Sequence, residues 1–296
     1  MKFIALSLLL FLSSNYAICQ RKSETIPFFI NKQSNICIKA LINDRDSVVL
    51  MFHSASNGLT LLKEVIDKKV HLKADKSIQV ESWGGNNSAD FSNGNSLTIG
   101  KMRWDSLTIF LNENSGDQTD GKFGFDFFKN EIIEIDYDNQ LLTIHKSIPK
   151  KVKKYFKLPF YIRNETIYLP ASLHFENDIY RDTFILHTGY GGSVLLDPKV
   201  GEQYGMQSAL PTISTSELRD SYNNIIKIET KELPEIRIGN KTVQKVSLSF
   251  ANKSSNISMK VLGNDLLKRF NLIFDFKTNN LYLTENSLYK IPFSIK

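Results

Sequence analysis

Residues 52–62 read Phe-His-Ser-Ala-Ser-Asn-Gly-Leu-Thr-Leu-Leu, and residues 186–196 read Leu-His-Thr-Gly-Tyr-Gly-Gly-Ser-Val-Leu-Leu. Each stretch follows an apolar run, is interrupted by small residues and continues as a second apolar run. This pattern brings one polar side chain to the end of a buried strand and then turns the chain away. Because the pattern occurs twice, we expect two similar halves, with His53 and His187 meeting where the halves face each other.

A second pair of matching segments supports a duplication. Residues 123–129 match residues 262–268, and the match continues without a gap to residues 144 and 283, at a constant offset of 139 (262 − 123). The two histidines are separated by a similar offset of 134 (187 − 53). Two ordered pairs of segments at nearly one offset indicate an internal repeat of the size of a small domain.

Most of the remaining chain predicts short strands. Residues 36–42 and 47–52 flank a polar turn, and residues 167–173 and 180–186 do the same in the second half. Short helices are expected at residues 62–70, 124–129 and 263–269. Many short strands, few helices and two similar halves predict an all-β, bilobal architecture with a cleft between the lobes.

The half-site pattern resembles that of the two-lobed aspartic proteases, the pepsin and retropepsin family, in which each lobe supplies one catalytic aspartate. In that family an apolar strand leads into Asp-Thr/Ser-Gly/Ala, and a later apolar-apolar-Gly element precedes a short helix. Ser54-Ala55 and Thr188-Gly189 match the two residues that follow the aspartate, and residues 123–124 and 261–263 match the later element. The resemblance implies the acid-protease fold, built by an internal duplication.

The chain departs from this family at the catalytic positions. The resemblance covers about residues 35–148 and 166–286, but His53 and His187 stand where the family has its two aspartates. In the family, two neighbouring carboxylates share one proton, and the ionised member activates a water molecule. Two imidazoles remove the negative charge and fill the space that the water needs. We therefore expect no pepsin-like proteolysis.

Two functions of different classes remain open. The first is a pseudoprotease that binds an extended peptide in the inter-lobe cleft, because strand addition needs only backbone groups and side-chain pockets. The second is an active peptidase or other hydrolase that uses the His53/His187 pair as a base or as ligands of a bound metal. The sequence contains no His-x-x-x-His or Cys-x-x-Cys spacing to add ligands, so neither a metal nor another cofactor is expected. A third possibility is a purely structural partner of another exported protein, for which the sequence contains no positive evidence.

Residues beside the histidines are expected to support the site. By resemblance, the hydroxyls of Ser54 and Thr188 hydrogen-bond across the lobe interface and brace the two loops, with Ala55 and Gly189 next to them. Ser54 is not expected to act as a nucleophile activated by His53, because neighbouring residues of a strand point to opposite faces.

Three further residues have assigned roles. Trp83 lies where the family has a hairpin flap over the cleft, so it is a candidate for closing over a bound peptide, with a core tryptophan as the alternative. Asp126 and Asp265 occupy matching positions at the starts of two predicted helices. We expect them to cap those helices rather than to form a displaced dyad.

The N-terminal residues predict export. Residues 1–19 have an early positive charge, a Leu-rich run and a small-x-small ending, as in a cleaved secretory signal. A lipoprotein acylated at Cys19 is the alternative. The mature chain is expected to be secreted or periplasmic and to comprise two lobes, residues 20–149 and 150–296. Cys37 lies in a strand-like apolar context and is expected to be buried.

Charge and hydropathy limit the class of partner. The formal net charge is +6, and the densest basic run lies at residues 150–157, between the two repeats. Because no aromatic-basic platform or recognition helix accompanies it, we interpret the run as a solvated linker and not as a nucleic-acid site. After the leader, no segment approaches the roughly 20 apolar residues of a membrane span. The expected partner is a peptide or unfolded polypeptide segment, bound by a monomer.

Overall fold

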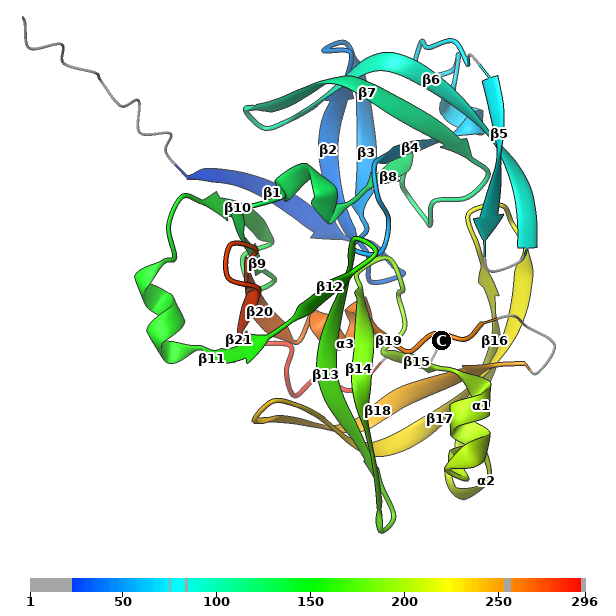
Figure 1. Ribbon diagram of the computed structural model, residues 1–296, viewed down its shortest axis with the longest axis vertical. Coiled ribbons are helices and arrows are strands. Elements are labelled where there is room, and N and C mark those ends of the chain that lie inside the picture. The colour runs from blue at the N-terminus through cyan, green and yellow to red at the C-terminus, as the bar shows by residue number, and fades with distance from the viewer. Residues whose placement is uncertain (1–22, 75, 83–84, 253–256, 294–296) are drawn as a thin grey trace, which may run out of the picture.

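The computed structural model has two β-rich lobes, which lie one above the other in Figure 1 and are joined along one side by a third group of strands. It describes residues 23–74, 76–82, 85–252 and 257–293. The expected leader (residues 1–19, with Cys19) and the flap residue Trp83 lie outside the described residues. The predicted all-β, bilobal fold is confirmed.

The N-terminal lobe is one continuous sheet. Its strands are β1 (Glu24–Ile30), β2 (Ile36–Ile42), β3 (Asp46–Phe52), β4 (Leu59–Leu62), β5 (Lys76–Ser82), β6 (Gly85–Ile99), β7 (Met102–Asn112) and β8 (Gly121–Phe123). They are ordered β1-β2-β3-β8-β4-β7-β6-β5, and β2 also pairs with β6. Strand β8 runs parallel to β3 and antiparallel to β4, so it is inserted between the two strands that flank the first half-site.

The C-terminal lobe repeats this topology strand by strand. Its strands are β12 (Tyr161–Arg163), β13 (Thr166–Phe175), β14 (Asp178–His187), β15 (Val194–Leu196), β16 (Thr212–Arg219), β17 (Ile225–Ile238), β18 (Lys241–Ala251) and β19 (Val261–Gly263). Their order is β12-β13-β14-β19-β15-β18-β17-β16, with the matching additional pair β13–β17. The duplication inferred from two short motifs therefore extends over the whole of each lobe.

A connecting sheet, which is continuous with the N-terminal sheet through β1, joins the two lobes. It contains β9 (Ile132–Asp136), β10 (Leu141–His145), β11 (Phe156–Pro159), β20 (Phe270–Asp275) and β21 (Asn280–Glu285), in the order β11-β21-β20-β9-β10-β1. Strands β9 and β20 are antiparallel, and Glu134 pairs with Ile273, its own equivalent at the offset of 139 (273 − 134). The pseudo-twofold axis of the repeat therefore passes between these two strands.

Helical structure is short. The segments are the 3-10 helices η1 (Lys63–Val65), η2 (Phe125–Phe128) and η3 (Lys150–Lys154) and the α-helices α1 (Pro198–Gln203), α2 (Met206–Ala209) and α3 (Asn264–Leu267). The two helices predicted at the later repeat element are found, as η2 and α3. The helix predicted over residues 62–70 is wrong, because η1 is one turn long and Asp67 then takes a left-handed φ of 64°, which ends a right-handed helical run.

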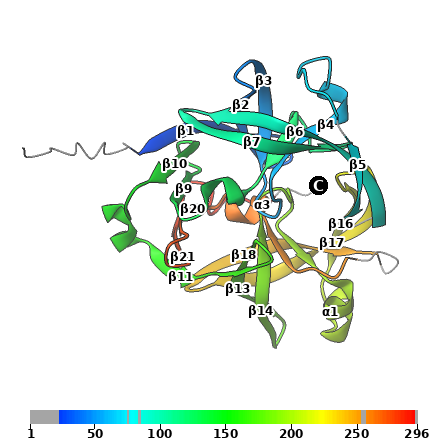
Figure 2. The same ribbon diagram turned by 45° about the horizontal axis from the view of Figure 1, so that its top comes forward.

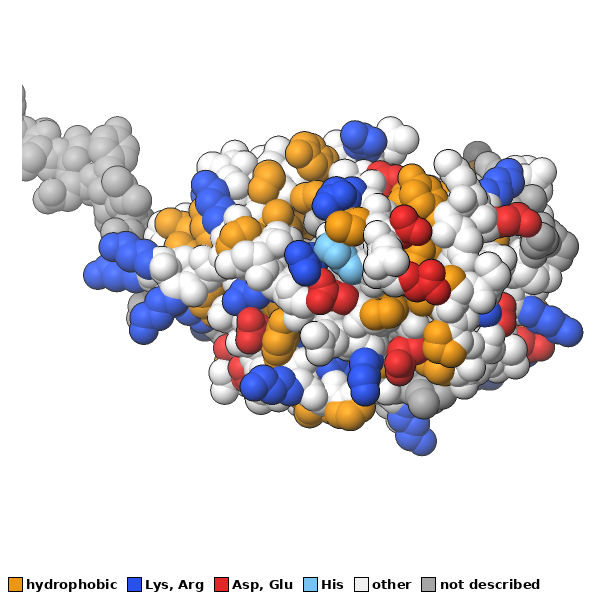
Figure 3. Space-filling view, turned by 90° about the horizontal axis from the view of Figure 1, so that it is seen from below, with side chains coloured by type: hydrophobic (Ala, Val, Ile, Leu, Met, Phe, Trp, Pro, Cys, Tyr) orange, Lys and Arg blue, Asp and Glu red, His pale blue; other side chains and the backbone are white. Residues whose placement is uncertain are grey.

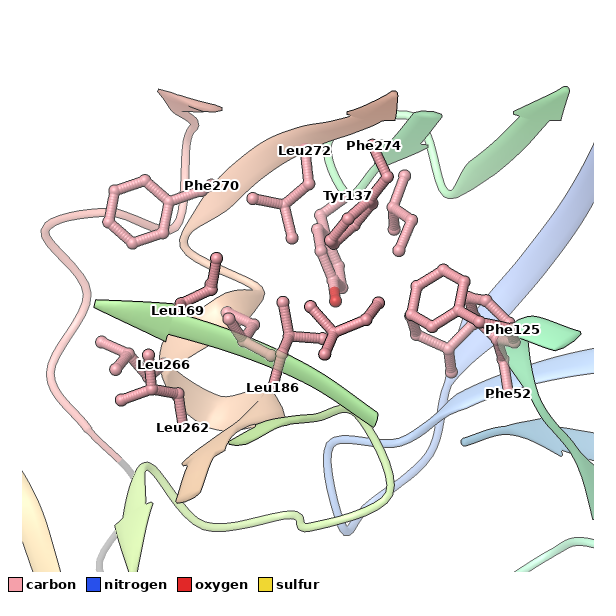
Figure 4. Close-up of a cluster of buried hydrophobic side chains, with 14 of the residues drawn as sticks. Phe52, Phe125, Tyr137, Leu169, Leu186, Leu262, Leu266, Phe270, Leu272 and Phe274 are labelled. Carbon is pink, nitrogen blue, oxygen red and sulfur yellow. The ribbon is translucent and has the colours of Figure 1, made fainter. Parts of the chain in front are cut away.

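The hydrophobic core crosses the boundary between the lobes. Figure 4 shows Phe52 and Phe125 of the N-terminal lobe facing Leu186 and Leu262 of the C-terminal lobe, beneath strand β20. These side chains belong to one buried cluster that also includes residues of the connecting sheet. Cys37 is fully buried, as predicted. Packing of this kind makes the half-site strands rigid relative to each other.

The basic run between the repeats is partly anchored. Lys151 of η3 pairs with the buried carboxylate of Glu134, which also hydrogen-bonds His145 Nε2 at 2.8 Å. Figure 3 shows the outer end of the C-terminal lobe, where basic and acidic side chains are interspersed among hydrophobic ones. Among the described residues, no helix is long and apolar enough to cross a membrane.

Candidate functional site

The two histidines lie at equivalent strand ends and meet. His53 directly follows β3, and His187 is the last residue of β14. Their ring centroids are 4.5 Å apart, and the ring planes are inclined at 57°. His187 is 4% exposed, and His53 is half-buried. The pairing of β3 with β8 and of β14 with β19 holds both strand ends in place.

The hydroxyls that follow the histidines form a reciprocal brace across the lobe interface. The backbone N–H of Ser54 donates to Thr188 Oγ1 at 2.9 Å, and the backbone N–H of Thr188 donates to Ser54 Oγ at 2.8 Å. Each hydroxyl in turn donates to a carbonyl of the opposite lobe, Ser54 to Leu186 and Thr188 to Phe52, both at 2.6 Å. Because both hydroxyl protons are used in this way, neither group is set up to act as a nucleophile.

Gly189 leaves open the space that the ring of His53 occupies. A Cβ atom added at Gly189 would lie 2.1 Å from Cδ2 and 2.5 Å from Nε2 of the His53 ring. The equivalent residue in the first half-site is Ala55, so the two sides of the pair differ by one methyl group. The ring of His53 thus covers the backbone of the opposite lobe, and the site is not strictly symmetric.

Replacement of Gly189 by alanine is expected to destabilise the protein by roughly 1–3 kcal/mol, because the new methyl group must push the His53 ring aside in a close-packed interface. Urea unfolding followed by fluorescence measures this change. Gly58→Ala is the control, since a Cβ there meets nothing within 4 Å and only the left-handed φ of 73° adds strain. If Gly189→Ala unfolds at the same urea concentration as wild type, the contact between His53 and Gly189 carries no packing constraint.

Both imidazoles are neutral at physiological pH. Burial lowers the pKa of His187 to about 3, and the ammonium of Lys122 lowers it further by like-charge repulsion. Burial, His187 and Lys122, in that order, hold the pKa of His53 well below its usual range. Nδ1 of His53 makes no hydrogen bond to any described residue. The charge at this point is therefore set by Lys122 and not by the histidines.

Lys122 lies beside the histidine pair and was not among the residues that the sequence predicted for the site. It lies on β8, is 8% exposed, and its Nζ donates to Ser221 Oγ at 2.5 Å. Burial lowers its pKa to about 8. One signal was available, because the second repeat has the apolar Val261 at the position that matches the charged Lys122.

A cleft of about 950 Å³ opens over the histidine pair. Ile78 and Val80 of β5 line one wall, and Ser216 and Leu218 of β16 line the other. Strands β5 and β16 are the last strands of their sheets, so each has one edge without a strand partner. Figure 2 shows the β5–β6 and β16–β17 hairpins facing each other on the side opposite the connecting sheet. The cleft therefore lies between two sheet edges.

The tip of the β16–β17 hairpin reaches across to the N-terminal lobe. The carbonyl of Ser221 accepts hydrogen bonds from the backbone N–H groups of Glu113 and Asn114, at 2.9 and 3.0 Å. Asn224 Nδ2 donates to Asn87 Oδ1 on β6 at 3.4 Å. By the repeat, this hairpin is the counterpart of the β5–β6 hairpin expected as the flap. One hairpin over the cleft was expected from the resemblance, whereas each lobe contributes one.

The roles assigned to two aspartates need correction. Asp126 and Asp265 do not cap η2 and α3, because the N-cap positions are Gly124 and Gly263 and no side chain caps either helix. Asp126 instead accepts a hydrogen bond from the backbone N–H of Gly58 at 3.0 Å. Asp265 accepts one from the Ser193 hydroxyl at 3.1 Å. Each carboxylate ties its helix to the loop after the half-site, and neither belongs to the histidine pair.

The histidine pair has no further metal ligands beside it among the described residues. Among the described residues, no group of three or more His, Cys, Asp or Glu side chains could hold a metal ion. His145 is bound to Glu134, and His174 is bound to Ser172 at 2.9 Å. The donor set at the site therefore consists of two imidazoles beside a cation, which is a poor match for a divalent metal.

Comparisons with known proteins agree with this topology. No protein-family model matches the chain, and no curated protein matches it. Among solved structures, the crystal structure of the aspartic proteinase from Irpex lacteus superimposes with a TM-score of 0.60 at 13% sequence identity. The match covers 91% of this chain and 99% of the proteinase. This likeness shows that the chain has an aspartic-proteinase-like fold.

Proposed function

We propose that this protein is an exported, non-proteolytic member of the aspartic-protease fold that binds an extended peptide in the inter-lobe cleft. The observation that carries the proposal is the pair of neutral imidazoles, 4.5 Å apart, at the positions of the family's two aspartates. Among the described residues, none of the groups that shift the pKa of either ring is a carboxylate. Export rests on the leader, residues 1–19, which would be removed from the mature protein.

The electrostatics argue against the histidines as general bases. A general base works best when its pKa lies near the working pH, and the pKa of His187 is about 3. Proton uptake would create an imidazolium beside the ammonium of Lys122. This is unfavourable because a buried charge loses its hydration and because the two positive charges repel each other. The close approach of the rings, with Gly189 against His53, also leaves little room for a water molecule between them.

The walls of the cleft favour an extended peptide as ligand. The free edges of β5 and β16 present backbone N–H and C=O groups that can pair with an added strand. Apolar side chains alternate with polar ones along these edges, including Ile78, Val80 and Leu218. Backbone pairing would supply affinity, and the side-chain pockets would supply selectivity.

Replacement of Ile78 by aspartate should weaken peptide binding by about tenfold or more, because a charge on the cleft wall must be desolvated against the ligand. Fluorescence anisotropy with labelled, unstructured decapeptide pools measures this. Ile179→Asp is a matched control: both side chains are 40% exposed, but Ile179 lies on β14 away from the cleft. Equal affinities for the two variants would place the peptide elsewhere and contradict the proposal.

The hydrolase alternative is tested on the same samples. We expect wild-type protein to leave a denatured protein substrate intact from pH 4 to pH 8. Cleavage that disappears in both His53→Ala and His187→Ala would make the protein an active hydrolase and would overturn the non-proteolytic reading.

A further inference from the structure

A buried cation faces the cleft without an ion-pair partner. Lys122 is 8% exposed and lines the cavity next to both histidines. Its described hydrogen-bond partner is the neutral hydroxyl of Ser221, and no carboxylate of the described residues lies within ion-pair distance of it. Buried charges in proteins are as a rule paired or hydrogen-bonded to an opposite charge. Because the carboxylate of Asp220 acts on this ammonium only from beyond ion-pair distance, the ammonium is expected to receive a direct counter-charge from a ligand.

Two hydroxyls without a hydrogen-bond partner among the described residues line the same cavity as this ammonium. Lys122 on β8 pairs in register with Thr60 on β4, so the two side chains project from the same face of the sheet into the cleft. The hydroxyl of Thr60 is buried and makes no hydrogen bond to any described residue, and the same is true of Ser115, which also lines the cavity. Buried hydroxyls without partners are rare and costly. A ligand oxygen would satisfy them.

We propose that the cleft contains a carboxylate-binding site in which the ammonium of Lys122 and the hydroxyls of Thr60 and Ser221 hold the anion beside the neutral histidine pair. A single negative charge fits better than a dianion, because the nearby carboxylate of Asp220 already acts on Lys122. The site thus carries a positive charge, whereas an aspartate dyad carries a negative one. In its peptide form this inference rests on the proposed function, and the carboxylate is then an acidic side chain or a C-terminus.

Small ligands test the site without any assumption about peptides. We expect benzoate and acetate to raise the melting temperature of the wild-type protein and their neutral isosteres, benzamide and acetamide, to have no such effect. In Lys122→Met the apparent Kd for benzoate should rise about 30-fold or more, since one partner of a buried charged pair is lost. Lys129→Met is the control, because that side chain is 63% exposed and pairs with Glu165 on the surface.

A second variant keeps the test decisive if Lys122→Met folds poorly. Thr60→Val is isosteric and removes the unpaired hydroxyl, so we expect it to fold and to weaken benzoate binding about tenfold. Equal stabilisation by benzoate and benzamide would overturn the inference. So would benzoate binding that both Lys122→Met and Thr60→Val leave unchanged.

Matched peptide pools identify the source of the carboxylate. One pair of decapeptide pools differs only in a central Asp or Asn, and the other differs only in a free or amidated C-terminus. The wild-type protein should prefer the acidic member of one pair by about 30-fold, and Lys122→Met should abolish that preference. If benzoate binds but none of the peptide pools binds, the carboxylate-binding site is supported and the peptide-binding function is contradicted. If all pools bind equally well, the peptide function stands and the carboxylate site fails.

Discussion

Acidification from pH 7 to pH 4.5 should strongly destabilise this protein, with the free energy of unfolding falling by up to about 2.7 kcal/mol per pH unit below pH 6.5. In the unfolded chain, His53 and His187 take up protons near pH 6.5. In the folded protein their pKa values are depressed by burial and by Lys122, that of His187 to about 3. Between pH 3 and pH 6.5 the unfolded state therefore binds more protons, so stability is lost as the pH falls through this window.

The window above pH 4.5 excludes the carboxylates whose pKa values are lowered by the fold; Asp126, whose pKa burial raises, changes stability in the opposite direction to the histidines. Asp46 and Asp182 have lowered pKa values through Arg45 and Lys260, but the stability they add is lost only below their unfolded pKa near 4. Urea unfolding curves recorded at half-unit steps from pH 4.5 to pH 7.5 give the slope directly.

Two sets of variants show whether the histidine pair causes the slope. Replacing His53 and His187 by asparagine should remove most of the pH dependence, whatever the change in absolute stability; the remaining slope is assigned to His174, whose pKa burial also lowers. His71→Asn is the control, because the side chain of His71 is 64% exposed. A wild-type slope near zero, or one that survives in the double variant, would mean that the pair is not held neutral by the fold.

The sequence was sufficient to predict the fold because the decisive signals are local. Small residues after an apolar run, repeated at one offset, gave the positions of His53 and His187 and of the later Gly elements. The brace between Ser54 and Thr188 was expected from the resemblance to the aspartic proteases, and the pseudo-twofold relation of the lobes makes its hydrogen bonds reciprocal. The repeat was enough to predict two similar halves and the meeting of the rings, whereas the acid-protease fold was implied by the family resemblance.

The remaining features depend on contacts between distant segments. Lys122 and Ser221 are separated by 99 residues. The strand that carries Lys122 is three residues long, so no periodicity in the sequence shows which way the lysine side chain faces. The docking of the β16–β17 tip on Glu113 is likewise a tertiary contact. The predicted helix over residues 62–70 failed for the opposite reason, because an apolar spacing suited to a helix was overridden by the turn at Asp67.

Restoring both aspartates should not by itself restore proteolysis, because Lys122 would remain. In His53→Asp combined with His187→Asp, the nearby ammonium would favour the ionised form of both carboxylates. A working dyad needs one carboxylate protonated and one ionised. We therefore expect the double variant to cleave a denatured protein at most weakly, at any pH from 3 to 7.

Adding Lys122→Val to the two aspartates should raise cleavage about 10²–10⁴-fold over the wild-type background, with a maximum at acidic pH, since the pair can then share one proton. Valine is chosen because the second repeat has Val261 at the matching position, inside an otherwise equivalent strand. Lys122→Val alone should stay inactive, which separates the effect of the dyad from that of the cavity. If the double variant is as active as the triple variant, Lys122 does not control the charge at this site. If neither variant cleaves, the two hairpins or the reciprocal brace hold the carboxylates in a geometry that cannot activate water. The replacement of the two aspartates by histidine would then not be the only cause of the lost activity.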